Sequence, residues 1–243
     1  SGTTTDNRPS PSPATVAGRL GRRLIDVRVP PPGIEVGTGR KRSGKRVLMV
    51  GTDCALGKKY TALALHQAMV EAGANATFRA TGQTGILIAG EGMPMDSVVA
   101  DFASGAAEQL SPDNDPDHWD VIEGQGSLFH PGFAAVSLGL LHGSQPDALV
   151  ICHQAGRETI NAYPDFPLPS LTECIDLNLR MARLTNPDAR AAAISLNTSK
   201  LDEARAREAL AAAEAETGLP AADPIRFGAA RLAEAVLTAE PAE

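Results

Sequence analysis

Residues 51–59 of the chain read Gly51-Thr52-Asp53-Cys54-Ala55-Leu56-Gly57-Lys58-Lys59, and we refer to them as the phosphate loop. The apolar run 47–50 comes directly before the loop, and a helical pattern follows it over 60–71. In a strand–loop–helix unit of this kind, backbone N–H groups converge on an anion and the helix N-terminus adds its dipole. The stretch therefore predicts an α/β scaffold that binds the phosphate groups of a ligand.

The phosphate loop departs from the usual pattern in two ways. It has one extra residue between Gly51 and Gly57, and Lys59 stands where a Ser or Thr would bind Mg²⁺. Without that hydroxyl, we do not expect ordinary Mg²⁺-dependent hydrolysis of a nucleoside triphosphate. No group of His, Cys and acidic residues has the spacing of a zinc site, so no metal ligands are assigned. The residues expected to contact ligand phosphates are Gly51, Thr52, Asp53, Gly57, Lys58 and Lys59.

Short apolar runs alternate with helical patterns along the rest of the chain. Strands are predicted at 47–50, 76–79, 119–123, 148–153 and 191–196, with an edge strand at 224–227. Helices are predicted at 60–71, 96–110, 171–184, 202–216 and 229–238. This alternation is typical of βαβ units. The predicted fold is P-loop NTPase-like: a doubly wound, mainly parallel sheet with helices on both faces.

The pattern also divides the chain into three parts. Residues 1–18 are rich in Ser, Thr, Pro and Gly, which indicates a disordered tail or linker. Residues 19–46 are predicted to be a connecting segment. Residues 47–243 are predicted to form one P-loop-like α/β domain, which is long enough to bury a sizeable core.

Composition limits the classes of partner. The formal net charge of −7 offers no positive field for nucleic acid, and no apolar run is long enough to span a membrane. Three cysteines at wide, unpatterned spacing argue against a disulfide framework and for a reducing cytoplasm. We expect a cytoplasmic homo-oligomer that acts on a small-molecule substrate, without a nucleic-acid or membrane partner.

Polar residues follow the other predicted strands. Because the carboxyl ends of parallel strands meet at one edge of a sheet, these residues should lie near the phosphate loop. They are Arg79, Thr81, Gln83 and Thr84 after the second strand, Glu123, Gln125, Ser127 and His130 after the third, and His153 and Arg157 after the fourth.

Several of these residues allow more than one interpretation. Glu123 ends an apolar strand beside glycines, where a phosphate-loop protein places a metal ligand or a base. His130 could be a general base or a turn residue, and His153 a ligand contact or a core histidine. Arg157 is suited to gripping a carboxylate or phosphate but could also be a solvated surface residue. Cys54 could be a nucleophile, but we favour a small packing side chain.

The motifs taken together resemble one family, long catalogued as a domain of unknown function, whose members are described as D-glutamate N-acetyltransferases. The similarity covers roughly residues 20–240, and dethiobiotin synthetases resemble the chain more distantly. The stretches that carry the similarity are 51–59, 81–85, 123–131, 141–147, 163–170 and 195–198.

The resemblance implies acetyl-CoA as acetyl donor, D-glutamate as acceptor, and an additional N-terminal α/β domain, absent here, of which 19–46 would be the trailing end. Lys58 and Lys59 could hold CoA phosphates without Mg²⁺. Forming the amide requires a base, for which Glu123 and His130 are the candidates. Backbone N–H groups at 82–85 or 124–127 could bind the thioester oxyanion. The expected substrate-binding residues are Arg79, Thr81, Gln83, Thr84, Gln125, Ser127, His153 and Arg157.

Two other functions stay open at this point. One is an ATP-dependent ligase or kinase of the dethiobiotin synthetase type, which would use ATP and Mg²⁺. The other is a module that binds a nucleotide or CoA without turnover.

Overall fold

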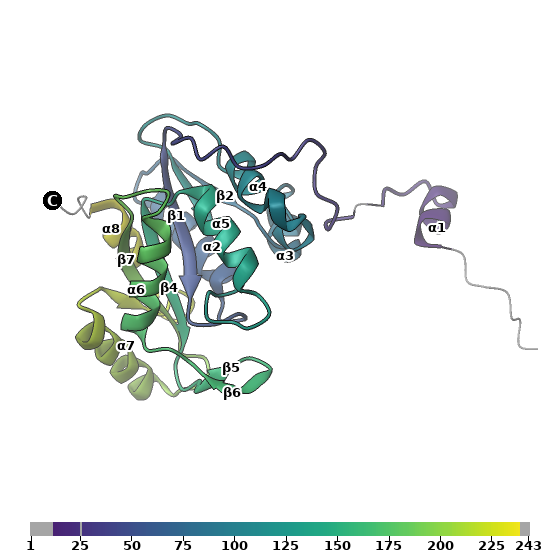
Figure 1. Ribbon diagram of the computed structural model, residues 1–243. Helices are drawn as coiled ribbons and strands as arrows, with labels where there is room; N and C mark the ends of the chain where they lie inside the picture. The colour runs from purple at the N-terminus through teal and green to yellow at the C-terminus, as the bar shows by residue number, and fades with distance from the viewer. Residues whose placement is uncertain (1–11, 25, 239–243) are drawn as a thin grey trace, which may run out of the picture.

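A six-stranded sheet runs through the centre of the domain (Figure 1). The protein is described here by a computed structural model, which covers residues 12–24 and 26–238. The strands lie in the order β2-β3-β1-β4-β7-β8, and every neighbouring pair is parallel. The carboxyl ends of the strands therefore share one edge. The strands are β1 (Lys45–Gly51), β2 (Ala76–Arg79), β3 (Trp119–Ile122), β4 (Ala148–Gln154), β7 (Arg190–Asn197) and β8 (Ala221–Ala222).

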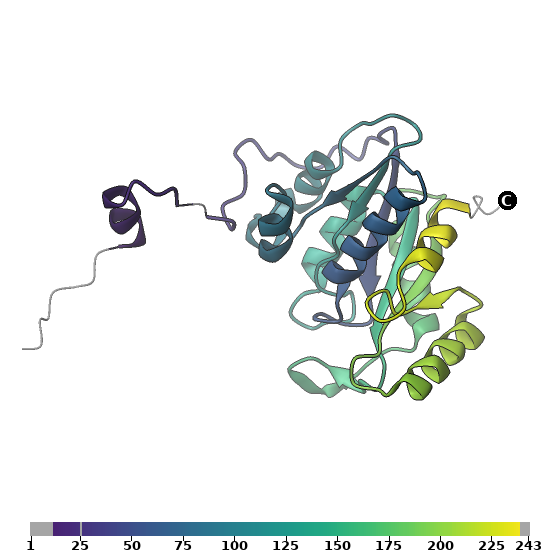
Figure 2. The same ribbon diagram turned by 180° about the vertical axis from the view of Figure 1, so that it is seen from behind.

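Helices cover both faces of the sheet because side chains alternate sides along each strand. On β1, Val47 and Met49 pack toward one layer of helices, whereas Leu48 packs toward the other. The two layers are seen from opposite sides in Figures 1 and 2. The predicted doubly wound α/β fold is confirmed. The first layer holds α2 (Lys58–Glu71) and α8 (Ala230–Thr238); the second holds α4 (Ala103–Leu110), α5 (Ala134–Ser144), α6 (Leu171–Ala182) and α7 (Glu203–Thr217).

Some elements differ from the sequence prediction. The helix predicted over 96–110 is two 3-10 turns, Met95–Ser97 and Ala100–Phe102, followed by α4. The edge strand predicted at 224–227 is wrong, because the strand at this edge is the short β8. Within the domain, three further elements were not predicted: helix α3 (Gln83–Ala89), helix α5, and the antiparallel hairpin of β5 (Thr159–Ile160) and β6 (Tyr163–Pro167).

Helix α5 is not predicted from the sequence because it contains glycines, which its packing against α4 requires. A Cβ atom on Gly143 would lie 2.1 Å from the carbonyl oxygen of Ser104 in α4. A Cβ atom on Gly139 would lie 2.7 Å from the Cβ atom of Ala103. The two helices thus approach each other so closely that only glycine fits, although glycine in a helix interior lowers helix propensity.

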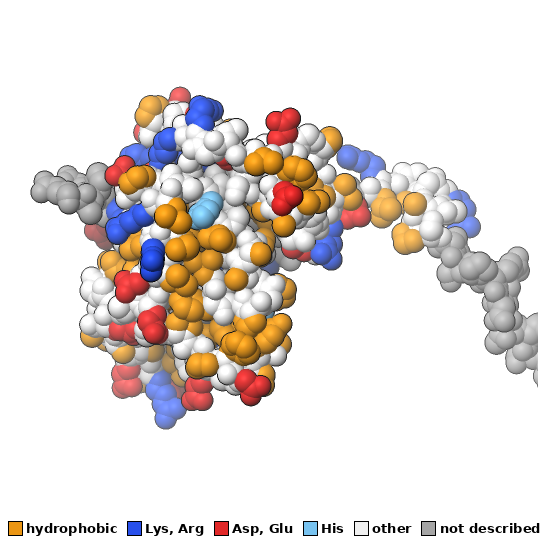
Figure 3. All heavy atoms as spheres, viewed as in Figure 1, with side chains coloured by type: hydrophobic (Ala, Val, Ile, Leu, Met, Phe, Trp, Pro, Cys, Tyr) orange, Lys and Arg blue, Asp and Glu red, His pale blue; other side chains and the backbone are white. Residues whose placement is uncertain are grey.

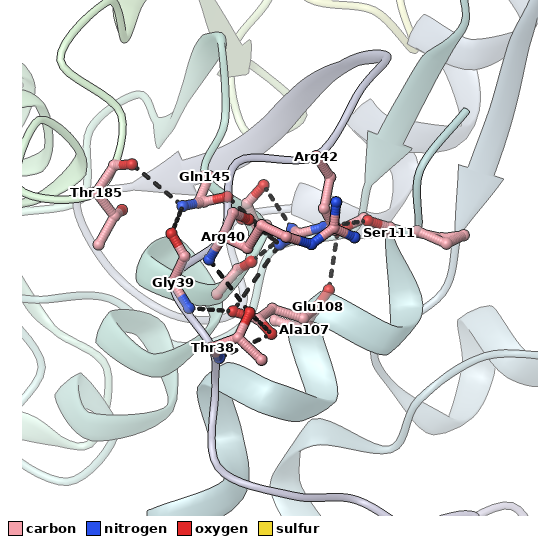
Figure 4. Close-up of polar contacts among 12 residues, drawn as sticks. Thr38, Gly39, Arg40, Arg42, Ala107, Glu108, Ser111, Gln145 and Thr185 are labelled. Atoms are coloured by element: carbon pink, nitrogen blue, oxygen red, sulfur yellow. Dashed lines mark hydrogen bonds and ion pairs between the residues drawn. The ribbon is translucent and has the colours of Figure 1, made fainter. Parts of the chain in front are cut away.

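The segment before β1 is fastened to the domain by a buried arginine (Figure 4). Arg42 donates from Nε to the carbonyl oxygen of Ser111 and from Nη2 to that of Gly143, both over 2.7 Å. Nearby, the Glu108 carboxylate accepts from the backbone N–H groups of Thr38 and Gly39. The last part of the predicted connecting segment therefore packs on α4 and α5 as part of the domain's structure.

Further upstream, helix α1 (Pro13–Arg19) lies apart from the sheet, and none of its residues is buried (Figure 1). It falls in the stretch predicted as a tail or linker, of which residues 1–11 lie outside the described part of the chain. The division into tail, connecting segment and domain stays a prediction. None of the helices in the described ranges combines the length and the apolar character needed to cross a bilayer.

Candidate active site

The phosphate loop joins β1 to α2 at the carboxyl edge of the sheet. Its two glycines, Gly51 and Gly57, meet requirements of the backbone that other residues would not. Gly57 has φ = 109°, in the left-handed region, and directly precedes the 14-residue helix α2. A Cβ atom on Gly51 would lie 2.5 Å from the carbonyl oxygen of Cys152 on β4. The loop is therefore drawn against the neighbouring strand, with the N-terminus of a long helix at its end.

The two lysines of the loop differ in environment. Lys58 is buried, and its Nζ donates to the carbonyl oxygen of Asp53 over 2.7 Å. Burial lowers the pKa of Lys58. Lys59 lies with its Nζ 4.5 Å from the ring centroid of Tyr60 and lines the groove described below. The loop thus encloses the ammonium group of Lys58, whereas Lys59 lines the groove, where a ligand can reach it.

Asp53 ties the loop to the chain that follows β4. Its carboxylate is completely buried, and Oδ2 accepts from Nη1 of Arg157 over 2.8 Å and from the backbone N–H of Asn161 over 2.7 Å. Oδ1 accepts from the backbone N–H of Cys54. Arg157, predicted to bind substrate, is therefore engaged with a carboxylate of the protein itself.

Three further predicted residues support the same loop. Thr52 is buried, and its hydroxyl lies 2.9 Å from Nδ1 of His153. Burial lowers the pKa of His153. Ser127 donates from its hydroxyl to the carbonyl oxygen of Gly51 over 2.8 Å. These contacts fix the loop to β4 and to the turn after β3.

Glu123 follows β3 directly and lies beneath the first turn of α3. Its Oε2 accepts from the backbone N–H groups of Thr81 and Gly82 over 3.0 and 3.2 Å. A Cβ atom on Gly85 would lie 2.1 Å from the same oxygen, so a larger residue there would displace the Glu123 carboxylate from this position. Burial raises the pKa of Glu123, and the two backbone hydrogen bonds oppose this rise. The carboxylate is held by one oxygen while the residue lines two cavities.

Three cavities adjoin one another along this edge of the sheet. A cavity of about 450 Å³ lies over the phosphate loop and is lined by Cys54, Lys58, Lys59, Glu123 and Gln125. It shares Lys59, Glu123 and Gln125 with a cavity of about 390 Å³ that also contains Gln83 and Thr84. It shares Gly57, Tyr60 and Asn197 with a cavity of about 530 Å³ on the other side. We call the three together the groove.

Most of the predicted site residues therefore meet in or beneath the groove, but Arg79 does not. Its Nε donates to the Asp120 carboxylate over 2.7 Å, and it lines a separate cavity of about 260 Å³ with Phe78 and Glu91. Thr81 is buried and donates from its hydroxyl to the carbonyl oxygen of Glu123.

The 530 Å³ cavity contains residues that the sequence prediction missed. Its wall combines apolar and polar side chains, among them Tyr60, Asn197, Asp223, Ile225 and Arg226. Asn197 directly follows the strand predicted at 191–196 and could have been found by the rule used for the other loops. Asp223 follows the two-residue strand β8, which is too short to give a periodic signal.

His130 lies beneath the loop and not in the groove wall. Its ring is buried, stacks on Phe133 with centroids 4.4 Å apart, and meets the edge of Tyr163 at 5.1 Å. A ring nitrogen of His130, Sγ of Cys54 and a carboxylate oxygen of Asp53 all lie within 4.8 Å of one another. Apolar side chains are exposed over the nearby β5–β6 hairpin (Figure 3), where Phe166 is 48% exposed.

Comparison with known proteins places these features in a family. Residues 35–233 match the P-loop domain of DUF1611, described as a domain of unknown function. A protein of Tritonibacter scottomollicae named D-glutamate N-acetyltransferase is 52% identical over 229 residues, 94% of this chain and 69% of its own length. A protein of a Pseudoalteromonas species with the same name is 53% identical over 205 residues, 84% of this chain and 62% of its own length.

A solved structure is also similar to this chain. The crystal structure of a DUF1611 family protein from Anabaena variabilis has a TM-score of 0.84 and 43% sequence identity, over 90% of this chain and 65% of that one. The chain thus spans about two thirds of the length of each of these relatives. The phosphate loop, the parallel sheet and the matched residues lead to one conclusion: the chain, which is similar to two proteins named D-glutamate N-acetyltransferase, belongs to the DUF1611 family.

Proposed function

We propose that the protein transfers the acetyl group of acetyl-CoA to the amino group of D-glutamate. The observation that carries this proposal is the groove, in which a phosphate loop with Lys59 in place of the magnesium-binding hydroxyl lies between two further cavities. The names of two relatives at 52% and 53% identity support the choice of reaction.

CoA fits this arrangement because it is long and carries its charge at one end. Its pyrophosphate would bind the N–H groups of the phosphate loop, with Lys58 and Lys59 neutralising the charge. The adenosine part would occupy the 530 Å³ cavity, where Tyr60 and Ile225 offer apolar surface and Asn197 and Arg226 offer polar contacts. The acetyl end would then point along the groove toward Glu123.

Glu123 is the residue best placed to act as base. The amino group of D-glutamate must lose a proton as its nitrogen bonds to the thioester carbon and the carbon–sulfur bond to CoA breaks. A carboxylate whose pKa is raised by burial takes that proton more readily at neutral pH than an ordinary one. The proton then passes to the departing CoA thiolate. Gln83, Thr84 and Gln125 line the same end of the groove and would orient the acceptor.

The test is the release of free thiol from acetyl-CoA by the intact protein, with D-glutamate, L-glutamate or no acceptor present. We expect thiol release that depends on D-glutamate, together with N-acetylglutamate identified by mass spectrometry. Failure to bind CoA and absence of product would overturn the proposal. The use of a small-molecule substrate, the cytoplasmic location and the homo-oligomeric state stay predictions.

A further inference from the structure

Cys54 lies in the wall of the groove and not in the core, where a side chain that serves only packing would be expected. It lies at the tip of the phosphate loop, is only half-buried, and lines the 450 Å³ cavity together with Lys58, Lys59 and Glu123. The Nδ2 group of Asn161 lies 3.8 Å from its sulfur. The other two cysteines, Cys152 and Cys174, are buried in the core. Cys54 is thus the cysteine that a ligand in the groove can reach.

His130 lies behind Cys54 with an unused hydrogen-bonding atom. The backbone N–H of Gly132 donates to Nδ1 of His130 over 3.1 Å, so in the neutral ring the proton sits on Nε2. His130 is 1% exposed, and its Nε2 has no hydrogen-bond partner among the described residues. A buried N–H without a partner is costly and calls for an explanation. One nitrogen of the His130 ring lies within 4.8 Å of the Cys54 sulfur, so a negative charge that forms on this sulfur would be stabilised by the ring N–H.

The same three residues, Asp53, Cys54 and His130, could in principle bind a metal ion. Two contacts argue against it. A metal on Nε2 would require the ring proton on Nδ1, where the N–H of Gly132 already points. The Asp53 carboxylate is occupied by Arg157 and by the backbone N–H groups of Cys54 and Asn161. The hydrogen bonds already made by Asp53 and by Nδ1 of His130 therefore leave the cluster unsuited to a cation.

We propose that Cys54 carries the acetyl group covalently between acetyl-CoA and the acceptor, with His130 as a positioning residue that stabilises the sulfur anion. This inference rests on the acetyl transfer proposed above, and it replaces the direct attack on acetyl-CoA described there with two steps that pass through Cys54. Exchange of one thioester for another is nearly neutral in free energy, so the enzyme can hold the acetyl group without further input.

In the first half-reaction, the Glu123 carboxylate takes the thiol proton of Cys54. The sulfur then bonds to the acetyl carbonyl carbon, the carbon–sulfur bond to CoA breaks, and the CoA thiolate takes the proton back from Glu123. In the second half-reaction, the acceptor reacts as its neutral amine, whose ammonium proton has gone to solvent; the amine nitrogen bonds to the same carbon and gives one proton to Glu123. The Cys54 sulfur leaves and receives that proton, which restores the starting enzyme.

The resting state of the thiol agrees with this order of events. Burial, followed by the nearby Asp53 charge, raises the pKa of Cys54. The thiol therefore stays protonated until a base acts on it, which protects it from oxidation between turnovers. Glu123, which lines the same cavity, is that base.

The experiment uses acetyl-CoA with the intact protein and no acceptor. We expect a burst of about one equivalent of CoA, an added acetyl mass on the peptide containing Cys54, and none on the peptides containing Cys152 or Cys174. Labelled CoA should exchange into acetyl-CoA under the same conditions. Cys54→Ala should lose the burst, the exchange and at least about 100-fold of the transfer to D-glutamate.

His130 is tested through the reactivity of the thiol. His130→Gln keeps an amide donor near the Nε2 position and should retain labelling, whereas His130→Ala should raise the thiol pKa seen in the pH profile of iodoacetamide alkylation. Circular dichroism checks that both variants fold. Identical alkylation profiles in folded His130→Ala and wild type would overturn the role of His130.

The outcomes separate this inference from the proposed function. If Cys54→Ala acetylates D-glutamate at the wild-type rate, transfer is direct and the covalent route is wrong, while the proposed function stands. If wild type forms no product with D-glutamate, the proposed function itself fails. One equivalent of bound zinc that is lost in Cys54→Ala would identify a metal site and would also overturn the covalent role.

Discussion

Arg157 donates from Nη1 to Oδ2 of Asp53 over 2.8 Å, and through this contact the chain after β4 holds the phosphate loop in place. Asp53 is 0% exposed, and the backbone N–H of Asn161 donates to the same oxygen. Arg157 precedes β5 and Asn161 lies between β5 and β6, so the chain is bonded to the loop on both sides of β5. The loop conformation depends on a charge pair between segments about a hundred residues apart.

Replacing Asp53 with Asn should destabilise the protein, because the positive charge of Arg157 would lose the negative charge of the Asp53 carboxylate that balances it. We expect a loss of about 3 kcal/mol in the free energy of unfolding, near the low end for a broken buried pair since Arg157 is 18% exposed. Urea unfolding measures it. Glu203→Gln removes the exposed pair with Arg207 and serves as the control, with a change of at most about 0.5 kcal/mol. Equal effects of the two substitutions would show that the Asp53 pair is not structural.

Glu123→Gln should reduce acetyl transfer by about 10²- to 10⁴-fold, because an amide cannot accept the proton of the acceptor amine. Steady-state kinetics with D-glutamate measures the loss, and CoA binding should change little. A variant that keeps more than about a tenth of the wild-type rate would remove Glu123 from the role of base.

The same residue should make stability depend on pH. The folded state raises the pKa of Glu123, so its protonated form stabilises the fold. That contribution is complete below the ordinary pKa of a glutamate and is lost as pH rises through the raised pKa. Relative to Glu123→Gln, wild type should therefore lose stability as pH increases above the ordinary pKa of a glutamate. Parallel urea curves for both proteins measure the difference; a gap that stays constant with pH would contradict it.

Gly124→Ala should prevent correct folding of the site. A Cβ atom at this position would lie 1.7 Å from the carbonyl oxygen of Met49 and 2.9 Å from Cδ of Lys58. β1 and the turn after β3 would have to separate, which costs about 3 kcal/mol for overpacking at the backbone. Gly18→Ala, which meets nothing within 4 Å, is the control. Thermal unfolding compares the two, and similar melting temperatures would refute the packing described.

Arg226→Ala should weaken CoA binding by about tenfold but leave dephospho-CoA binding unchanged, because the arginine lines the cavity assigned to the adenosine end. Arg231→Ala, which removes an ion pair with Glu214 outside the groove, is the matched control. Calorimetric titration of both ligands measures the effect. A loss of affinity that is equal for the two ligands would place the 3′-phosphate elsewhere.

Much of the fold follows from local patterns. The apolar strands, the glycines of the phosphate loop and the helix after it are all visible in a short window of sequence. Helix α5 was missed because Gly139 and Gly143 serve contact with α4, a partner some forty residues away that no window contains. The strand β8 was misplaced because two residues give no alternation.

The location of the site was predictable for a different reason. In a parallel sheet the strand ends must meet, so Glu123, Gln125 and the phosphate loop had to be neighbours. The partners of charged side chains were not predictable in this way. Arg157 binds Asp53 and Arg79 binds Asp120, and these pairings depend on distances between segments far apart in sequence. The sequence allowed Cys54 to be a nucleophile or a packing side chain, and the nucleophilic role proposed above depends on the cavity and on the unpaired His130 nitrogen, which the sequence does not show.

The most direct measurement is a calorimetric titration of CoA into the intact protein in EDTA, repeated with Lys58→Met and with Mg²⁺-ATP in place of CoA. We predict metal-independent CoA binding with a dissociation constant between about 1 μM and 1 mM. Lys58→Met should weaken it by about 10- to 100-fold, since a charge-assisted contact to phosphate is lost, while Lys45→Met at the opposite edge of the sheet should not. Tight binding of Mg²⁺-ATP with no binding of CoA would contradict the assignment of this groove to acetyl-CoA.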